Sequence, residues 1–122
     1  MRRRVTPPPA DDVFAPVRAL GLALPGVEAA TRYDGSPVLK LRGCFMAGLA
    51  MHASAEPGTL VVRSSLEDRA YLLDEAPEAY YVTDYYRPYP IVLVRLSRVD
   101  RAALTDLLSS SWRLTAPKAR TR

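Results

Sequence analysis

Apolar residues recur at helical spacing in three stretches of the chain. In the first stretch the apolar positions repeat every three or four residues, at Val13, Val17, Leu20 and Leu24. Asp11 and Asp12 are placed to cap this helix and to favour its positive end. Pro16 fits only the first helical turn. The sequence therefore predicts a first helix that begins near Asp11 and Asp12 and ends at Leu24-Pro25-Gly26.

Two further helices are predicted in the second half of the chain. A helix over residues 66–75 follows Ser64 and Ser65, each of which has an acidic residue three positions later, as in a capping box. Its apolar positions are Leu66, Ala70 and Leu73. The last helix is capped by Asp100 and stopped by Pro117. Its apolar face contains Leu104, Leu107, Leu108 and Trp112.

Between these helices the pattern changes to that of β-strands. Residues 38–42 alternate between apolar and polar side chains, residues 44–51 are apolar on both faces, and residues 59–63 form a third strand. Short turns at Gly43 and at residues 55–58 join these three strands, as in an antiparallel meander. Residues 91–96 form another strand, preceded by a short strand and a loop in a tyrosine-rich stretch. The order α-β(3)-α-β(2)-α predicts an α+β fold, a two-layer antiparallel sheet with helices mainly on one face.

Length and composition are those of one globular domain. The chain has 122 residues, of which 48% are hydrophobic and 25% are charged. No apolar run reaches the roughly 20 residues of a membrane-spanning helix, and the arginines and prolines at the start do not resemble a secretory signal. One cysteine excludes an internal disulfide. We therefore expect a cytoplasmic prokaryotic protein that does not contact a membrane.

The net charge of +4 is concentrated at the two ends of the chain. Residues 1–10 and 115–122 contain six cations and no acid, which leaves 11 basic against 13 acidic residues elsewhere, a net charge of −2. We expect residues 1–10 to be a disordered, basic, proline-rich tail. Residues 11–117 then form a single domain, and residues 118–122 form a basic C-terminal tail.

Few residues in the chain suit catalysis or metal binding. A zinc site needs about three or four Cys, His or carboxylate ligands, whereas this chain has one cysteine, Cys44, and one histidine, His52. These two could share a strand face, but two groups do not complete a site. Nucleophilic catalysis needs a nucleophile, a base and an orienting group, and there is no glycine-rich phosphate loop. The sequence thus predicts no enzyme activity, no cofactor and no metal.

The alternation of side chains along the predicted strands places four cations on the same face of the sheet. Lys40 and Arg42 lie two residues apart, and Arg63 and Arg95 alternate with apolar neighbours. If the leucines face the helices, all four cations project from the open face, where they could hold phosphates while nearby tyrosines stack on bases. The alternative is an ordinary solvated face, covered by long cationic side chains.

Five of the seven tyrosines fall within residues 80–89. A tyrosine buries a large ring while its hydroxyl seeks a polar partner. We expect most of this cluster to anchor the segment on the core, through Tyr80, Tyr81, Tyr85 and Tyr86. Tyr89 and Arg87 each lie beside a proline and are candidates for an exposed contact.

Several short motifs occur in a characteristic order. They are Leu24-Pro25-Gly26-Val27-Glu28, Gly35-Ser36-Pro37-Val38-Leu39-Lys40-Leu41, Phe45-Met46-Ala47, Pro77-Glu78-Ala79-Tyr80-Tyr81, Leu96-Ser97-Arg98-Val99-Asp100, and Trp112 before Ala116-Pro117-Lys118. Over roughly residues 13–118 the chain resembles the MmcQ/YjbR-like family of small bacterial proteins. This resemblance implies a fold similar to that of secretion chaperones, a DNA-binding "double-wing" character and no enzyme activity. The chain has Cys44 where the family often has Lys, and Ile91 or Val92 where it often has Trp.

Two classes of function are compatible with these features. The first is a DNA-binding protein that contacts phosphates weakly through the cationic sheet face and the basic tails. Its candidate contact residues are Lys40, Arg42, Arg63, Arg87, Tyr89 and Arg95. The second is a protein-interaction or chaperone-like adaptor that uses the tyrosine-rich segment, residues 80–89.

Overall fold

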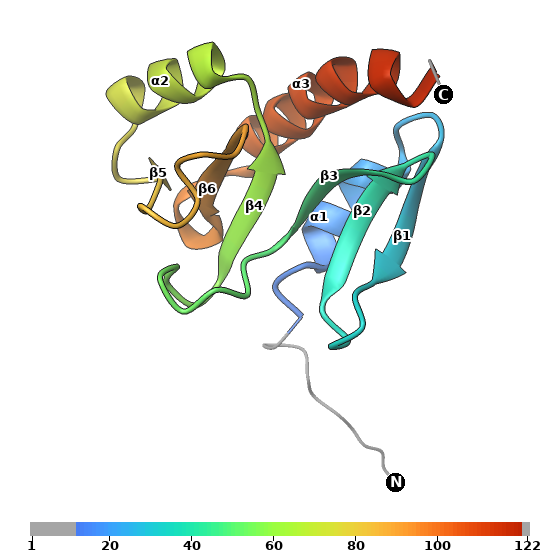
Figure 1. Ribbon diagram of the computed structural model, residues 1–122, viewed down its shortest axis with the longest axis horizontal. Helices are drawn as coiled ribbons and strands as arrows, with labels where there is room; N and C mark the ends of the chain where they lie inside the picture. The colour runs from blue at the N-terminus through green and yellow to red at the C-terminus, as the bar shows by residue number, and fades with distance from the viewer. Residues whose placement is uncertain (1–11, 121–122) are drawn as a thin grey trace, which may run out of the picture.

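The computed structural model describes residues 12–120, with side chains for residues 12–117. Within this range three α-helices accompany one antiparallel sheet (Figure 1). The helices are α1 (Ala15–Leu22), α2 (Leu66–Glu75) and α3 (Arg101–Arg120). The strands are β1 (Val27–Thr31), β2 (Pro37–Leu41), β3 (Cys44–Leu49), β4 (Thr59–Arg63), β5 (Tyr80–Tyr81) and β6 (Ile91–Arg95). The predicted α+β class is confirmed.

The sheet has one strand more than the sequence predicted. Its order is β1-β2-β3-β4-β6-β5, so four strands rather than three precede α2. The additional strand, β1, pairs with β2 from Val27 opposite Leu41 to Thr31 opposite Pro37. Its central residues are a glutamate and two alanines, which are depleted in strands. Pairing with a neighbouring strand outweighs that weak local preference.

The three helices pack on one face of the sheet, here called the inner face. The apolar side chains predicted to face the helices do so, and form one buried cluster: Leu39, Leu41, Leu60, Val62, Val92 and Val94. Phe14 and Val17 from the α1 region and Leu108 from α3 complete this core. The Trp112 Nε1 group donates a hydrogen bond to the Pro25 carbonyl at 2.8 Å and ties α3 to the segment that follows α1.

The ends of α1 and α3 differ from the prediction. Helix α1 begins at Ala15 without a side-chain cap, because its N-cap residue is Phe14, whose side chain has no acceptor atom. The Asp12 carboxylate lies 3.5 Å from Arg18 Nη1 instead. The helix ends at Leu22, before the Leu24-Pro25-Gly26 motif. Helix α3 is not stopped by Pro117 but continues to Arg120, although a proline inside a helix removes one backbone hydrogen bond.

The predicted C-terminal tail is therefore helical up to Arg120, while the predicted disorder of residues 1–10 lies outside the described residues. Helix α2 has the predicted cap, a hydrogen bond of 3.0 Å from the Asp68 amide to Ser65 Oγ. It has no fully buried residue. Leu72 and Leu73 reach the core, whereas Leu66, predicted to lie on the apolar stripe, is exposed.

The opposite face of the sheet, here called the outer face, has a small core of its own. Val61, Ile91 and Leu93 are buried there, and Phe45, Tyr81 and Tyr86 pack against them. Cross-strand pairing places Gly48, Val61, Leu93 and Tyr81 in one row across four strands. The outer face is therefore only partly open to solvent. Among the described residues, no helix is long and apolar enough to cross a membrane.

Candidate functional site

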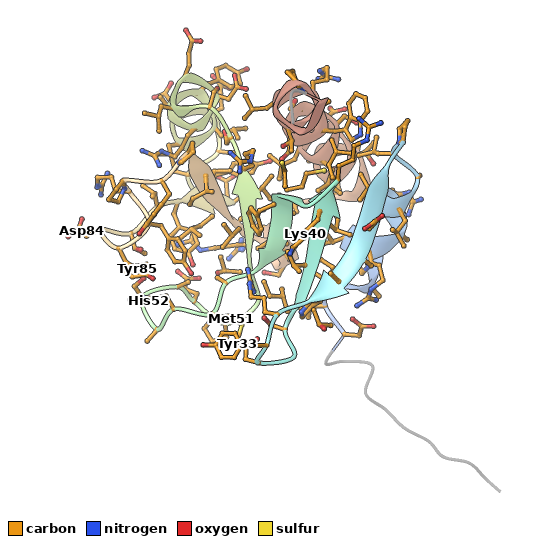
Figure 2. All side chains as sticks on the ribbon, turned by 45° about the vertical axis from the view of Figure 1, so that its right-hand side comes forward. Tyr33, Lys40, Met51, His52, Asp84 and Tyr85 are labelled. Atoms are coloured by element: carbon orange, nitrogen blue, oxygen red, sulfur yellow. The ribbon has the colours of Figure 1, made fainter. Side chains whose placement is uncertain are left out.

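Three of the four predicted cations belong to the outer face. Arg63 and Arg95 lie two residues from Val61 and Leu93, which face outward. Lys40 pairs with Phe45 of β3, another outward residue, and is visible on β2 in Figure 2. The register predicted for these three strands is correct.

Arg42 does not share that face. It occupies the β2–β3 turn with φ of 52°, followed by Gly43 with φ of 86°. Two positive φ angles in succession are typical of a two-residue type I′ hairpin turn, which interrupts the alternation of the strand. Its Nε atom lies 3.8 Å from the position that a Cβ atom on Gly26 would take. The prediction that Arg42 lies beside the other three cations was therefore wrong.

Arg95 is occupied by contacts within the protein. Its guanidinium forms two hydrogen bonds to the Glu56 carboxylate, of 2.8 and 2.9 Å, and donates to the carbonyls of Pro77 and Glu78 at 3.2 Å each. It also lies 4.3 Å from the centre of the Tyr81 ring. The hydrogen bond between the pair raises the pKa of Arg95 and lowers that of Glu56. We therefore regard Arg95 as a structural clamp.

Arg63 and Lys40 each have hydrogen-bond donors that have no partner within residues 12–117. Arg63 Nε donates a hydrogen bond of 2.9 Å to the Phe45 carbonyl, which fixes the plane of the guanidinium. Its two Nη atoms form no hydrogen bond or ion pair with the described side chains and backbone. Lys40 has no such partner within the same part of the chain, although it sits opposite Glu28 on β1. Both cations can therefore bind an external anion.

The tyrosine-rich loop (residues 82–90) rests against the β3–β4 loop (residues 50–58). The hydroxyl groups of Ser54 and Thr83 lie 2.9 Å apart, and the His52 amide donates to the Tyr86 hydroxyl at 3.3 Å. The Glu56 amide donates to the Tyr81 hydroxyl at 2.8 Å. These bonds connect two segments that lie about 30 residues apart in sequence.

The tyrosines divide into anchors and exposed rings. Tyr80 is buried in the inner core, and Tyr81 and Tyr86 pack on the outer one, as predicted. Tyr85 is not an anchor of that kind, because half of its surface is exposed while one ring face stacks on His52 at 3.5 Å (Figure 2). Tyr89 is equally exposed, as predicted.

Arg87 is exposed, as the sequence predicted, but it faces an acid. Its Nη2 atom lies 3.4 Å from the Asp84 carboxylate, which is fully exposed. Arg69 of α2 donates hydrogen bonds to the carbonyls of Arg87, Tyr89 and Ile91. That arginine therefore supports the loop from the side of the helix.

Two neighbouring pockets lie on the outer face, and we call them together the outer-face groove. The first, of about 320 Å³, is lined by Phe45, Val61, Arg63, Tyr85, Tyr86, Tyr89, Pro90 and Ile91. The second, of about 350 Å³, is lined by Arg32, Met51, His52, Val61, Tyr85 and Tyr86. Neither pocket has a carboxylate in its lining. The groove is therefore aromatic and cationic.

Arg32 and His52 were not predicted as site residues. The Arg32 Nη1 atom donates to Ser36 Oγ and to the Leu49 carbonyl, each at 2.9 Å. Its side chain passes over Gly48, where an added Cβ would lie 2.8 Å from Nη2. The contacts to Leu49 and Gly48 join residues far apart in sequence, so the pattern along the chain could not reveal them. A glycine inside a strand, which often marks a close approach, was the one available signal.

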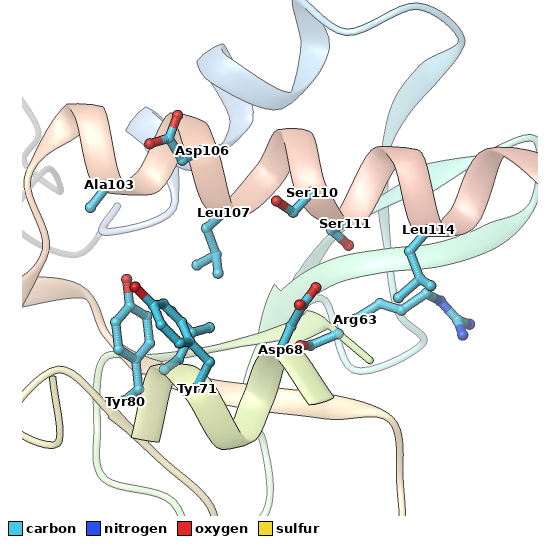
Figure 3. Close-up of a pocket in the computed structure, with 12 residues that line it drawn as sticks. Arg63, Asp68, Tyr71, Tyr80, Ala103, Asp106, Leu107, Ser110, Ser111 and Leu114 are labelled. Carbon is cyan, nitrogen blue, oxygen red and sulfur yellow. The ribbon is translucent and has the colours of Figure 1, made fainter. Parts of the chain in front are cut away.

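A third pocket, of about 390 Å³, lies between α2 and α3 on the helix side of the sheet. Figure 3 shows Asp68, Tyr71 and Tyr80 on one side of it and Leu107 and Ser110 of α3 on the other. Asp106 and Arg63 also line it, so Arg63 borders both this pocket and the outer-face groove. Burial, together with the nearby Asp100 and Asp106 carboxylates, raises the pKa of Tyr80. Its two carboxylates, Asp68 and Asp106, make this pocket less suited to a phosphate ligand than the outer-face groove, whose lining has none.

No group of three or more Cys, His, Asp or Glu side chains within residues 12–117 is arranged to hold a metal ion. Cys44 is half-buried at the start of β3. His52 lies in the loop beyond the end of that strand, with Nδ1 within 2.9 Å of Ser54 Oγ. The two residues do not share a strand face.

Comparison with known proteins finds relatives but no assigned activity. No family model matches the chain, and no solved structure matches it significantly. An uncharacterized protein of Mycobacterium bovis is 37% identical over 70 residues, which cover 54% of each chain. An uncharacterized protein of Mycobacterium tuberculosis strain H37Rv is similar to the same extent. The chain spans about half the length of the curated relatives it matches.

Proposed function

We propose that this protein binds nucleic acid through the outer-face groove. The observation that carries this proposal is the groove lining, in which Arg32 and Arg63 accompany Phe45, Tyr85 and Tyr89 without any carboxylate. Nucleic acids present phosphates, which cations bind, and bases, which aromatic rings stack on. The resemblance to the MmcQ/YjbR-like family, with its DNA-binding character, supports the same function.

Binding of this kind is weak and dominated by phosphate contacts. The chain outside residues 1–10 and 115–122 has a net charge of −2, and those two ends contain six cations. Affinity then falls by about 0.9 log units per log unit of salt for each phosphate neutralised. Removing residues 1–10 and 115–122 is expected to make affinity fall less steeply with salt. The contribution of Lys40 and Arg63 to this salt dependence remains.

The test is a titration of a fluorescent oligonucleotide with the full chain at several salt concentrations. The double variant Lys40→Ala, Arg63→Ala removes one cation that lines the groove and one that lies on the outer face opposite the groove residue Phe45. It is expected to weaken binding and to reduce the salt slope by up to about 2. The matched control is Arg101→Ala, Arg113→Ala, which removes the same charge from exposed positions on α3. Equal losses in both double variants would show that the groove is not the contact surface.

A protein-interaction adaptor is the second candidate. It is favoured by the exposure of large apolar side chains on the two outer-face loops, since Met51, Tyr85 and Tyr89 are each at least half exposed. Exposed apolar patches mark contacts with protein partners. No detectable oligonucleotide binding at low salt would support this candidate against the first.

A further inference from the structure

We infer that the outer-face groove accepts single-stranded nucleic acid and excludes intact duplex, with an unstacked base against the Tyr85 and Tyr89 rings and a phosphate on Arg63. This inference rests on the proposed function and specifies its ligand. It comes from the way two exposed rings and a fixed guanidinium line the same pocket.

The Tyr85 ring is held in place while half of its surface stays open. His52 stacks on it with an angle of 8° between the rings, and Tyr86 meets it edge-on at 5.0 Å. Tyr89 lies 6.3 Å away at 48°, so the two rings open toward the pocket that both of them line. A ring fixed by its neighbours loses little entropy when a base stacks on it.

The floor of this pocket is apolar and suits a flat, uncharged ring. Val61 and Ile91 are buried there beside Phe45. A volume of about 320 Å³ lies at the lower end of the range for small-ligand pockets. In a duplex, the faces of each base are covered by stacking, so only an unstacked base can enter such a pocket.

Arg63 supplies the anion contact at the edge of the same pocket. Its Nε bond to the Phe45 carbonyl orients the guanidinium, and the two Nη atoms form no hydrogen bond or ion pair within residues 12–117. A fixed guanidinium can bind two phosphate oxygens at once. A base pocket and a phosphate site beside each other match the repeating unit of a single strand.

The loops that form the pocket wall are already joined before any ligand arrives. Hydrogen bonds link Ser54 to Thr83 and His52 to Tyr86, and Arg69 holds the far end of the tyrosine-rich loop through its carbonyls. A preformed wall of this kind favours one shape of ligand.

The test compares a fluorescent single-stranded 12-nucleotide DNA with its duplex by anisotropy, using the full chain at one low salt concentration. We expect the single strand to bind at least about tenfold more tightly. Tyr85→Ala or Tyr89→Ala is expected to reduce single-strand affinity by about 5- to 150-fold, the range for loss of one stacked base. Tyr85→Phe keeps the ring and is expected to restore the affinity that Tyr85→Ala loses.

Tyr71→Ala is the matched control, since Tyr71 is an exposed tyrosine on α2, away from the groove. Circular dichroism of each variant checks that the fold is intact. Equal affinity for duplex and single strand, or single-strand binding that survives both tyrosine-to-alanine changes, would overturn this inference and leave the proposed function standing. Absence of binding to either DNA would overturn both.

Discussion

Replacing Arg95 by methionine tests whether this cation stabilises the fold or binds nucleic acid. The Arg95 guanidinium bonds to Glu56 and to two backbone carbonyls and lies over the Tyr81 ring. Methionine keeps the apolar stem of the side chain and removes every donor. We therefore expect Arg95→Met to weaken the fold while it leaves oligonucleotide binding nearly unchanged.

The size of the effect follows from the contacts that are lost. A cation over an exposed aromatic ring is worth about 0.5–1 kcal/mol. The two hydrogen bonds to carbonyls are long, at 3.2 Å, and contribute about 0.5 kcal/mol each, the low end of the usual range. The total is about 2 kcal/mol before any contribution of the partly exposed ion pair. At about 4 °C per kcal/mol for a domain of this size, the midpoint of thermal unfolding falls by about 8 °C.

Urea unfolding followed by circular dichroism measures this loss, and Lys40→Met is the matched control. Lys40 has no hydrogen bond or ion pair within residues 12–117, so its replacement is expected to change the free energy of unfolding by less than about 0.5 kcal/mol. Oligonucleotide binding is expected to show the reverse order, with Lys40→Met the weaker binder. An Arg95→Met variant of unchanged stability that no longer binds DNA would refute the assignment of Arg95 as a clamp.

Three further outcomes test other parts of the structure. The pKa of Glu56 is lowered by its bond to Arg95; its stabilising effect is therefore complete above its ordinary pKa and is lost as the pH falls through the lower folded value. The stability difference between wild type and Glu56→Gln should accordingly vanish in acid urea titrations. Arg42→Asn places Asn before Gly43 in a type I′ turn and is expected to raise stability by a few tenths of a kcal/mol in urea unfolding, without changing DNA affinity. Ser65→Ala removes the cap of α2 and is expected to cost about 1 kcal/mol in the same assay.

The parts of the fold that follow local rules could be predicted from the sequence. Alternating or apolar runs identified β2, β3, β4 and β6. Their parity correctly placed six side chains toward the helices: Leu39, Leu41, Leu60, Val62, Val92 and Val94. The caps of α2 and α3 were correct too, since the Asp100 carboxylate accepts from the Ala103 amide at 2.8 Å. In each case the relevant partner lies within a few residues.

The errors arise where distant partners decide the structure. Strand β1 forms because β2 pairs with it, and the sequence of β1 alone gives little reason for a strand. Arg95 has the parity of a surface cation, yet its partner Glu56 lies 39 residues away. The stack of His52 on Tyr85 depends on two loops that meet in space. A pattern within one segment has no information about such pairs.

The most direct test of the central claim is to locate the ligand by NMR. Amide chemical shifts of the full chain are recorded while a short single-stranded DNA is added. If the outer-face groove is the binding site, the largest changes fall on Phe45, Val61, Arg63, Tyr85 and Ile91. Changes concentrated on Tyr71 and Leu107, in the pocket between α2 and α3, or no changes at a saturating DNA concentration, would contradict the claim.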